Sequence, residues 1–186
     1  MGSQTTTRAR LLEAAITLMR QSGLSGAGIN EIVRESGAPK GSVYHFFPGG
    51  KEQIVSEALG LHAGRVVTFM EETLARPRTA PTKLKVLFDA YAERLESNRF
   101  QLSCPSGTVC LDIDAEMEAL RTCVAATFEQ YVGAIARHVA VGSERENKEF
   151  AAFVLTAIQG AYIRGRAERS GKPFREAGAW LAALAK

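Results

Sequence analysis

Apolar residues recur three and four positions apart along almost the whole chain, which is the spacing of one face of an α-helix. Near the N-terminus this pattern predicts a helix capped by Thr7, and two shorter helices follow it. The apolar positions of the three helices are Leu12, Ala15, Ile16 and Met19; Ile29, Ile32 and Val33; and Val43, Phe46 and Phe47. Three short helices with one apolar face each are expected to share one small core.

A tight turn joins the second and third of these helices. Gly37 lies where the turn needs a left-handed backbone, and Pro39 suits the first position of the next helix. The spacing predicts a helix-turn-helix motif over about residues 28–47, whose second helix enters the major groove of DNA. Polar side chains on that helix match phosphate oxygens and base edges. They are Lys40, Ser42, Tyr44 and His45, while the preceding helix has Asn30, Glu31, Arg34 and Glu35 on its polar face.

The rest of the chain also lacks the alternating pattern of a β-strand, so we expect an all-α protein. Apolar positions predict helices over residues 51–76, 84–95 and 115–139, the last capped by Asp114, while residues 98–108 interrupt the pattern. Ser143 and Glu146 have the spacing of a capping box, which predicts a helix ending near Arg169, and a final helix follows Pro173. We expect a DNA-binding domain over residues 5–65 and a second helical domain over residues 66–186.

Composition and charge narrow the kind of partner. No apolar run is long enough to span a bilayer, and no basic segment followed by an apolar one opens the chain, so we expect a cytoplasmic protein without a membrane partner. The formal net charge is only +3, which excludes a general polyanion binder and requires a local DNA-binding surface. Cations in and near the motif are expected to contact phosphates. They are Arg8, Arg10, Arg34, Lys40 and Lys51.

The three cysteines are Cys104, Cys110 and Cys123, an odd number that indicates free thiols. No Cys-x-x-Cys or His-x-x-x-His pair is present, so we expect no metal site. No nucleophile elbow, phosphate loop or HExxH motif is present, so we expect neither an enzyme nor a cofactor. Two alternatives stay open: a redox-sensing regulator that uses Cys104 and Cys110, and a helical small-molecule-binding protein or enzyme that does not bind DNA.

Residues 7 to 60 resemble the TetR-type transcriptional regulators. The resemblance rests on a pattern over residues 8–15 that ends in Ala14-Ala15, on Gly23 and Ile32, on Gly37-x-x-Lys40-Gly41-Ser42-Val43-Tyr44-His45-x-Phe47, and on Lys51-Glu52. Two further segments, Phe47-Pro48-Gly49-Gly50-Lys51-Glu52-Gln53 and Cys104-Pro105-Ser106-Gly107-Thr108-Val109, are similar to a subgroup of repressors next to multidrug-resistance transporter genes.

The resemblance implies contacts to a double-stranded DNA operator from Lys40, Gly41, Ser42, Tyr44, His45 and Lys51. The chain departs from the family where a hydroxyl residue usually opens the first motif helix, because Ala27-Gly28 stands there. We expect the backbone N–H groups that begin at Gly28 to take over that contact, and we expect Asn30 to bind DNA as well. Pro39 stands where the family usually has Ser or Thr.

The family also implies a homodimeric repressor whose C-terminal helices bind a small effector that releases the DNA. Aromatic side chains are numerous enough there to line an apolar cavity, so we expect an apolar or aromatic effector. Its expected contacts are Phe69, Phe88, Tyr91, Phe100, Cys104, Phe128, Tyr131 and Gln159. The last two helices are rich in small residues, which predicts a bundle with a second subunit. Its expected contacts are Ala151, Leu155, Ile158, Tyr162, Trp180, Leu181 and Leu184.

Overall fold

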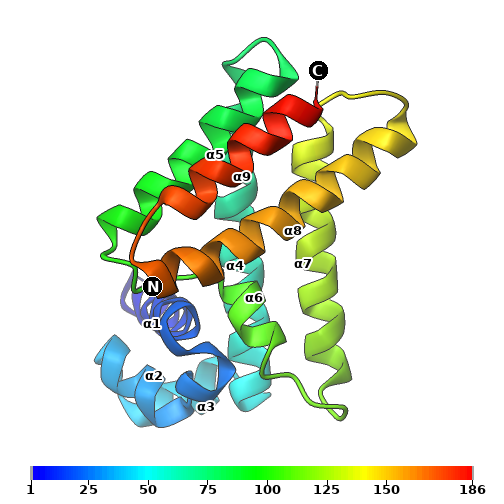
Figure 1. Ribbon diagram of the computed structural model, residues 1–186. Helices are drawn as coiled ribbons and strands as arrows, with labels where there is room; N and C mark the ends of the chain where they lie inside the picture. Colours follow the sequence, from blue (N-terminus) through cyan, green and yellow to red (C-terminus); the bar gives the residue numbers. More distant parts are fainter. Residues whose placement is uncertain (1, 186) are drawn as a thin grey trace. The chain divides into compact units, whose positions relative to one another are not determined.

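A computed structural model of the protein describes residues 2–185, and it describes side chains from residue 6 onward. Lys186, the last residue of the expected second domain, lies outside the described residues. Helices and short connections make up the described chain, which confirms the all-α prediction (Figure 1). The helices are α1 (Gly2–Gly26), α2 (Ile29–Ser36), α3 (Lys40–Phe46), α4 (Gly50–Ala75), α5 (Ala80–Ser97), α6 (Pro105–Cys110), α7 (Glu118–Ala136), α8 (Glu144–Glu168) and α9 (Lys172–Leu184).

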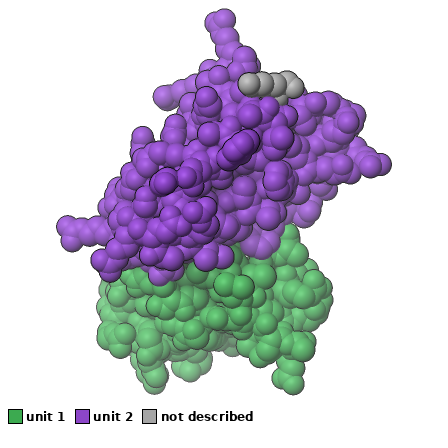
Figure 2. Space-filling model, in the orientation of Figure 1, with its two compact units in different colours: residues 1–62, 104–127 green, residues 63–103, 128–186 purple. Residues whose placement is uncertain are grey.

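The chain forms two compact units (Figure 2). Unit 1 contains the chain up to His62 together with Cys104–Thr127, and unit 2 contains Ala63–Ser103 and the chain from Phe128 onward. Helices α4 and α7 therefore each contribute residues to both units. None of the helices in the described chain is sufficiently long and apolar to cross a membrane.

The core of unit 1 joins α1, α2 and α3 through the apolar positions that the sequence predicts. Met19 of α1, Ile32 of α2 and Val43 of α3 are all fully buried. Between α2 and α3, Gly37 takes the left-handed conformation, with φ 60°, and its N–H donates to the Arg34 carbonyl. The helix-turn-helix prediction is therefore confirmed.

Two expected caps and one expected loop differ in the structure. Helix α1 already begins at Gly2, so Thr7 lies inside the helix instead of capping it. Asp114 accepts a hydrogen bond from the Glu116 N–H at 3.0 Å, which closes a turn, and α7 begins later, at Glu118. The segment expected to be irregular contains α6, because Pro105 can open a short helix and the Thr108 hydroxyl donates to the Met19 carbonyl of α1 at 2.7 Å.

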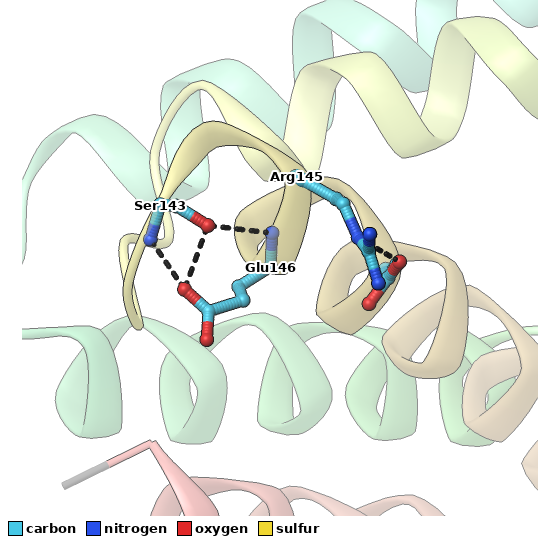
Figure 3. A network of polar contacts seen from close by, with 4 residues as sticks. Ser143, Arg145 and Glu146 are labelled. Atoms are coloured by element: carbon cyan, nitrogen blue, oxygen red, sulfur yellow. Dashed lines mark hydrogen bonds and ion pairs between the residues drawn. The ribbon is translucent and has the colours of Figure 1, made fainter.

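Unit 2 is built around the packing of α9 on α5 and α8. Its centre contains the rings of Phe88, Tyr91, Tyr162 and Phe174. The predicted capping box opens α8: the Ser143 hydroxyl accepts the Glu146 N–H, and the Glu146 carboxylate accepts the Ser143 N–H at 2.7 Å (Figure 3). Reciprocal bonds of this kind satisfy N–H groups at the helix start, so α8 begins where the sequence predicts.

Candidate nucleic-acid interface

Helix α3 divides its side chains between the core of unit 1 and the solvent. Val43 and the following Phe47 are fully buried, and they hold the helix on α1 and α2. Lys40, Gly41 and His45 are exposed, and Tyr44 retains 57% of its surface. An aromatic side chain with that much exposure adds little to the core, so this face is available to a partner.

All eight predicted DNA-binding residues lie in unit 1, and none is fully buried. Asn30 and the exposed residues of α3 are open to solvent, whereas Gly28, Ser42 and Lys51 are half-buried. Gly41 also faces open space, because a Cβ built on it would meet no heavy atom within 4 Å. Its backbone is therefore accessible to a partner at close range.

The two helices of the motif begin without side-chain caps. Gly28 occupies the N-cap of α2, and no side chain caps that helix. Pro39 occupies the N-cap of α3, one position before the first helical position that the sequence predicts for it, and its ring accepts no hydrogen bond. As the sequence predicts from Ala27-Gly28, α2 begins without a side-chain cap. Backbone N–H groups at the start of an uncapped helix are free to bind anions such as phosphate.

Arg8 and Arg10, which we expected to contact phosphates, contact other residues of unit 1 in the structure. Both Nε and a terminal nitrogen of Arg10 donate to the Ser36 carbonyl, the former at 2.9 Å. Arg8 forms an ion pair with Glu57, and its guanidinium carbon lies 5.1 Å from the centroid of the Phe47 ring. Their partners lie 26 and 49 positions away, so local sequence patterns give no signal for these contacts.

The predicted effector residues in unit 2 divide between a packed cluster and partly exposed positions. Phe88, Tyr91 and Tyr131 are buried, while Phe69, Phe100, Phe128 and Gln159 retain partial exposure. Tyr91 is central to the cluster: its ring stacks on Phe174 at 5.8 Å between centroids and meets Phe69 edge-on at 5.2 Å. Cys104 belongs to unit 1 instead. Sequence reasoning missed Phe174, whose signal was its i+7 spacing with the buried Leu181.

A hollow of about 1130 Å³ opens between α7 and α8 in unit 2. Its lining contains none of the eight predicted effector residues. Two of its cations are paired with acids at the same hollow: Lys148 with Glu129 at 3.0 Å, and Arg145 with Glu149 at 2.9 Å, the latter drawn in Figure 3. The lining residues are Glu129, Gly133, Ala136, Arg137, Ser143, Glu144, Arg145, Asn147, Lys148, Glu149 and Ala152.

Five of the seven predicted dimer contacts are buried within the single chain. They are Ala151, Leu155, Ile158, Tyr162 and Leu181. Four of them form the face of α8 that packs within the chain, and Leu181 belongs to the buried face of α9. Trp180 and Leu184 are 75% and 64% exposed, and on α8 the exposed apolar residues are Phe153 and Ile163, at 53% and 65%.

The two cysteines of the redox alternative lie at opposite ends of α6. Cys104 is buried at the N-cap, and Cys110 is exposed as the last helical residue. Six residues of helix rise about 9 Å, whereas the Cα atoms of a disulfide lie roughly 4.4–6.8 Å apart. A bond between these thiols would require α6 to unwind, so the geometry does not favour this alternative.

Comparison with known proteins assigns both parts of the chain. Residues 11–58 match the model of the tetR family of bacterial regulatory proteins, and residues 80–180 match the C-terminal domain of LmrA/YxaF-like transcriptional regulators. An uncharacterised HTH-type transcriptional regulator of Mycobacterium tuberculosis is 29% identical over 173 residues, which cover 89% of this chain and 87% of the relative. The HTH-type transcriptional regulator LmrA of Bacillus subtilis is 28% identical over 175 residues, with 89% of each chain covered.

Solved structures share the fold. The regulatory protein TetR from Rhodobacter sphaeroides superposes with a TM-score of 0.83 at 17% identity, covering 94% of this chain and 96% of that one. The two family models together account for the helix-turn-helix motif and for most of the remaining helices. The chain therefore belongs to the TetR family of transcriptional regulators, with a DNA-binding helix-turn-helix motif and a LmrA/YxaF-like C-terminal domain.

Proposed function

We propose that the protein is a cytoplasmic homodimeric repressor that binds a double-stranded DNA operator and releases it when a small apolar or aromatic effector binds. The observation that supports the proposal most is the two-sided character of α3. Val43 is buried and holds the helix on the core, while the exposed residues are Lys40, Gly41, Tyr44 and His45. A cation, an accessible backbone and two aromatic donors on one helical face suit the phosphates and base edges of a major groove.

Each residue of this face has a distinct role in the proposal. Lys40 and Lys51 bind phosphates, while Ser42, Tyr44 and His45 contact phosphates or base edges. Gly41 allows the backbone of α3 to approach the DNA closely. At the start of α2, the backbone at Gly28 and the side chain of Asn30 contact the phosphate backbone, because no side chain caps that helix.

The proposed dimer contact uses the exposed apolar residues of α8 and α9. Phe153, Ile163, Trp180 and Leu184 are each more than half exposed in the single chain. Large apolar side chains gathered on two neighbouring helices are typical of a protein interface. A second copy of the chain would cover them and would present two recognition helices for half-sites roughly 34–36 Å apart.

The aromatic cluster of unit 2 is the proposed effector site. Phe69 is its partly exposed member, and the Arg94 guanidinium carbon lies 3.4 Å from the centroid of its ring. A planar aromatic effector would stack on Phe69 in place of that guanidinium. Phe69 and Lys51 belong to the same helix, α4, so a displacement at the effector site is transmitted to a proposed phosphate contact. Coupling of this kind is typically worth about 1–3 kcal/mol.

The test begins with the full-length protein and a random library of DNA duplexes. Repeated selection is expected to yield a two-fold symmetric sequence that binds more tightly than a scrambled duplex of equal composition. A panel of planar aromatic compounds is then screened for thermal stabilisation of the protein and for loss of operator binding. Failure to enrich any sequence at low salt would sink the DNA-binding proposal. The resemblance to repressors beside multidrug-resistance transporter genes extends the proposal to such a target gene, which genomic footprinting checks.

A further inference from the structure

We propose that Arg8 and Arg10 are positioning residues, which fix the two ends of the recognition helix α3 from α1 and do not bind phosphate. The inference rests on the proposed DNA-binding function. It concerns two of the five cations that the sequence places in and near the motif. In the structure both guanidinium groups make contacts within unit 1.

Arg10 fixes the turn that precedes α3. Its guanidinium donates through two nitrogens to the carbonyl of Ser36, the last residue of α2. The Ser36 hydroxyl continues the connection, because it donates to the Val33 carbonyl at 3.1 Å and accepts the buried N–H of Ala38 at 3.2 Å. One side chain of α1 and one hydroxyl of α2 therefore hold the residues on both sides of Gly37.

Arg8 fixes the turn that follows α3. Its guanidinium lies over the ring of Phe47, the C-cap residue of α3, and forms an ion pair with Glu57 of α4. Glu57 accepts a hydrogen bond from Gln53 at 2.9 Å, and Gln53 in turn accepts the Gly49 N–H at 2.9 Å. A continuous chain of contacts thus runs from α1 to the loop immediately before the start of α4.

Helix α3 needs such support because of its length. It has seven residues, and no side chain caps its start. Helices this short have little stability of their own, so the surrounding contacts set their position and direction. The donors of Arg8 and Arg10 that make these contacts are not available to a phosphate oxygen.

Positioning and phosphate binding leave different signatures in DNA affinity. A lost phosphate contact weakens binding to every sequence. It also reduces the slope of log affinity against log salt concentration by roughly 0.9 for each contact. A lost positioning contact misaligns base-reading side chains, so it weakens binding to the operator far more than binding to unrelated DNA. The ratio of the two affinities therefore separates the roles.

The experiment uses the full-length protein, the duplex enriched from the random library, and a scrambled duplex of the same composition. Arg10→Lys keeps the charge but loses the planar fork, and Ser36→Ala loosens the same turn without touching any charge. Arg8→Lys probes the other turn in the same way. Arg10→Gln and Arg8→Gln remove the charge as well as the planar fork. Lys40→Ala serves as the phosphate-contact reference, and Arg145→Gln removes an arginine from the exposed start of α8 as the matched control. Far-UV circular dichroism verifies that each variant is folded.

We expect Arg10→Lys, Arg8→Lys and Ser36→Ala each to lower operator affinity about tenfold, with the scrambled-duplex affinity and the salt slope unchanged. Lys40→Ala lowers both affinities and the slope, and Arg145→Gln changes neither. The inference would be overturned if Arg10→Lys and Arg8→Lys left the operator affinity unchanged while Arg10→Gln and Arg8→Gln lowered both affinities and the salt slope. That result would assign the two residues to phosphate binding. Wild-type behaviour in every Arg8 and Arg10 variant would also overturn the inference. If the wild-type protein itself shows no operator preference, the proposed function fails instead, which is a separate outcome.

Discussion

Gly178 in α9 lies so close to Phe88 in α5 that a Cβ built on the glycine would stand 2.6 Å from the Cβ of Phe88. We expect Gly178→Ala to force the two helices apart and to lower the free energy of unfolding by about 2 kcal/mol, despite the better helix propensity of alanine. Urea denaturation measures the change. The matched control is Gly64→Ala in α4, where nothing lies within 4 Å and a gain of up to about 1 kcal/mol is expected. Equal effects at the two positions would contradict the close contact.

Gly41→Ala separates DNA contact from folding. A methyl group at this position meets no heavy atom of the protein within 4 Å, so we expect the free energy of unfolding to stay equal or to rise by up to about 1 kcal/mol. If the α3 backbone approaches DNA here, the same methyl group weakens operator binding at least about tenfold through a clash with the phosphate backbone. Fluorescence anisotropy with the selected duplex gives the affinity. Wild-type binding by the alanine variant would place the helix farther from the DNA.

Charge introduced at the exposed apolar residues of α8 and α9 is expected to separate the subunits. Trp180→Glu and Ile163→Glu replace side chains that are 75% and 65% exposed, so neither change disturbs the core of the single chain. Burying an unpaired carboxylate in an interface costs several kcal/mol, which shifts a dimer to monomer. Sedimentation velocity measures the mass. Leu111→Glu is the control, because Leu111 is 80% exposed in unit 1 and is expected to leave the dimer intact.

The ion pair of Glu96 with Arg175 predicts an acid-dependent contribution to stability. The hydrogen bond from Arg175 holds the pKa of Glu96 below its ordinary value of 4.5, although partial desolvation opposes the shift. The folded protein therefore releases this proton more readily than the unfolded chain, so the pair stabilises the fold at neutral pH. That contribution is lost as the pH falls from about 4.5 through the lower folded pKa.

Both side chains of this pair are more than a third exposed, so we expect Glu96→Gln to destabilise by only about 0.5 kcal/mol at pH 7. At pH 3 the difference between variant and wild type shrinks. Chemical denaturation at the two pH values checks this. Arg145→Gln breaks a more exposed pair and is expected to show a smaller effect at both values. If Glu96→Gln lowered the free energy of unfolding more at pH 3 than at pH 7, the result would contradict a lowered pKa of Glu96 in the folded protein.

Local chemistry made much of this fold predictable from the sequence. Gly37 marks a left-handed turn, and Ser143 with Glu146 marks the start of α8, because each requirement involves residues only a few positions apart. The exposed face of α3, where we propose DNA contact, follows from the same spacing, since Val43 and Phe47 are buried in the core.

Contacts between distant segments were not predictable in this way. The partners of Arg8 and Arg10 are set by how α1 packs, and no spacing rule reaches across 49 or 26 residues. Helix α8 has apolar or small residues on two faces, so periodicity alone does not say which face is covered by its own subunit. Predicted dimer contacts such as Leu155 and Ile158 are buried within the chain, whereas the exposed apolar side chains of the same helix are Phe153 and Ile163.

The uncapped starts of α2 and α3 have a consequence for motion in the free protein. With Gly28 and Pro39 at the N-caps, no cap side chain accepts a hydrogen bond from the first-turn amides of either helix, and in α3 the Ser42 N–H donates to the Pro39 carbonyl at 2.9 Å instead. We expect the amides of Asn30 and Gly41, at the starts of α2 and α3, to exchange with deuterium faster than the Glu146 amide of α8, whose N–H donates to the Ser143 hydroxyl. Bound operator would supply the missing acceptors. In the proposed complex, the helix starts that contact DNA are therefore also expected to become more ordered when DNA binds.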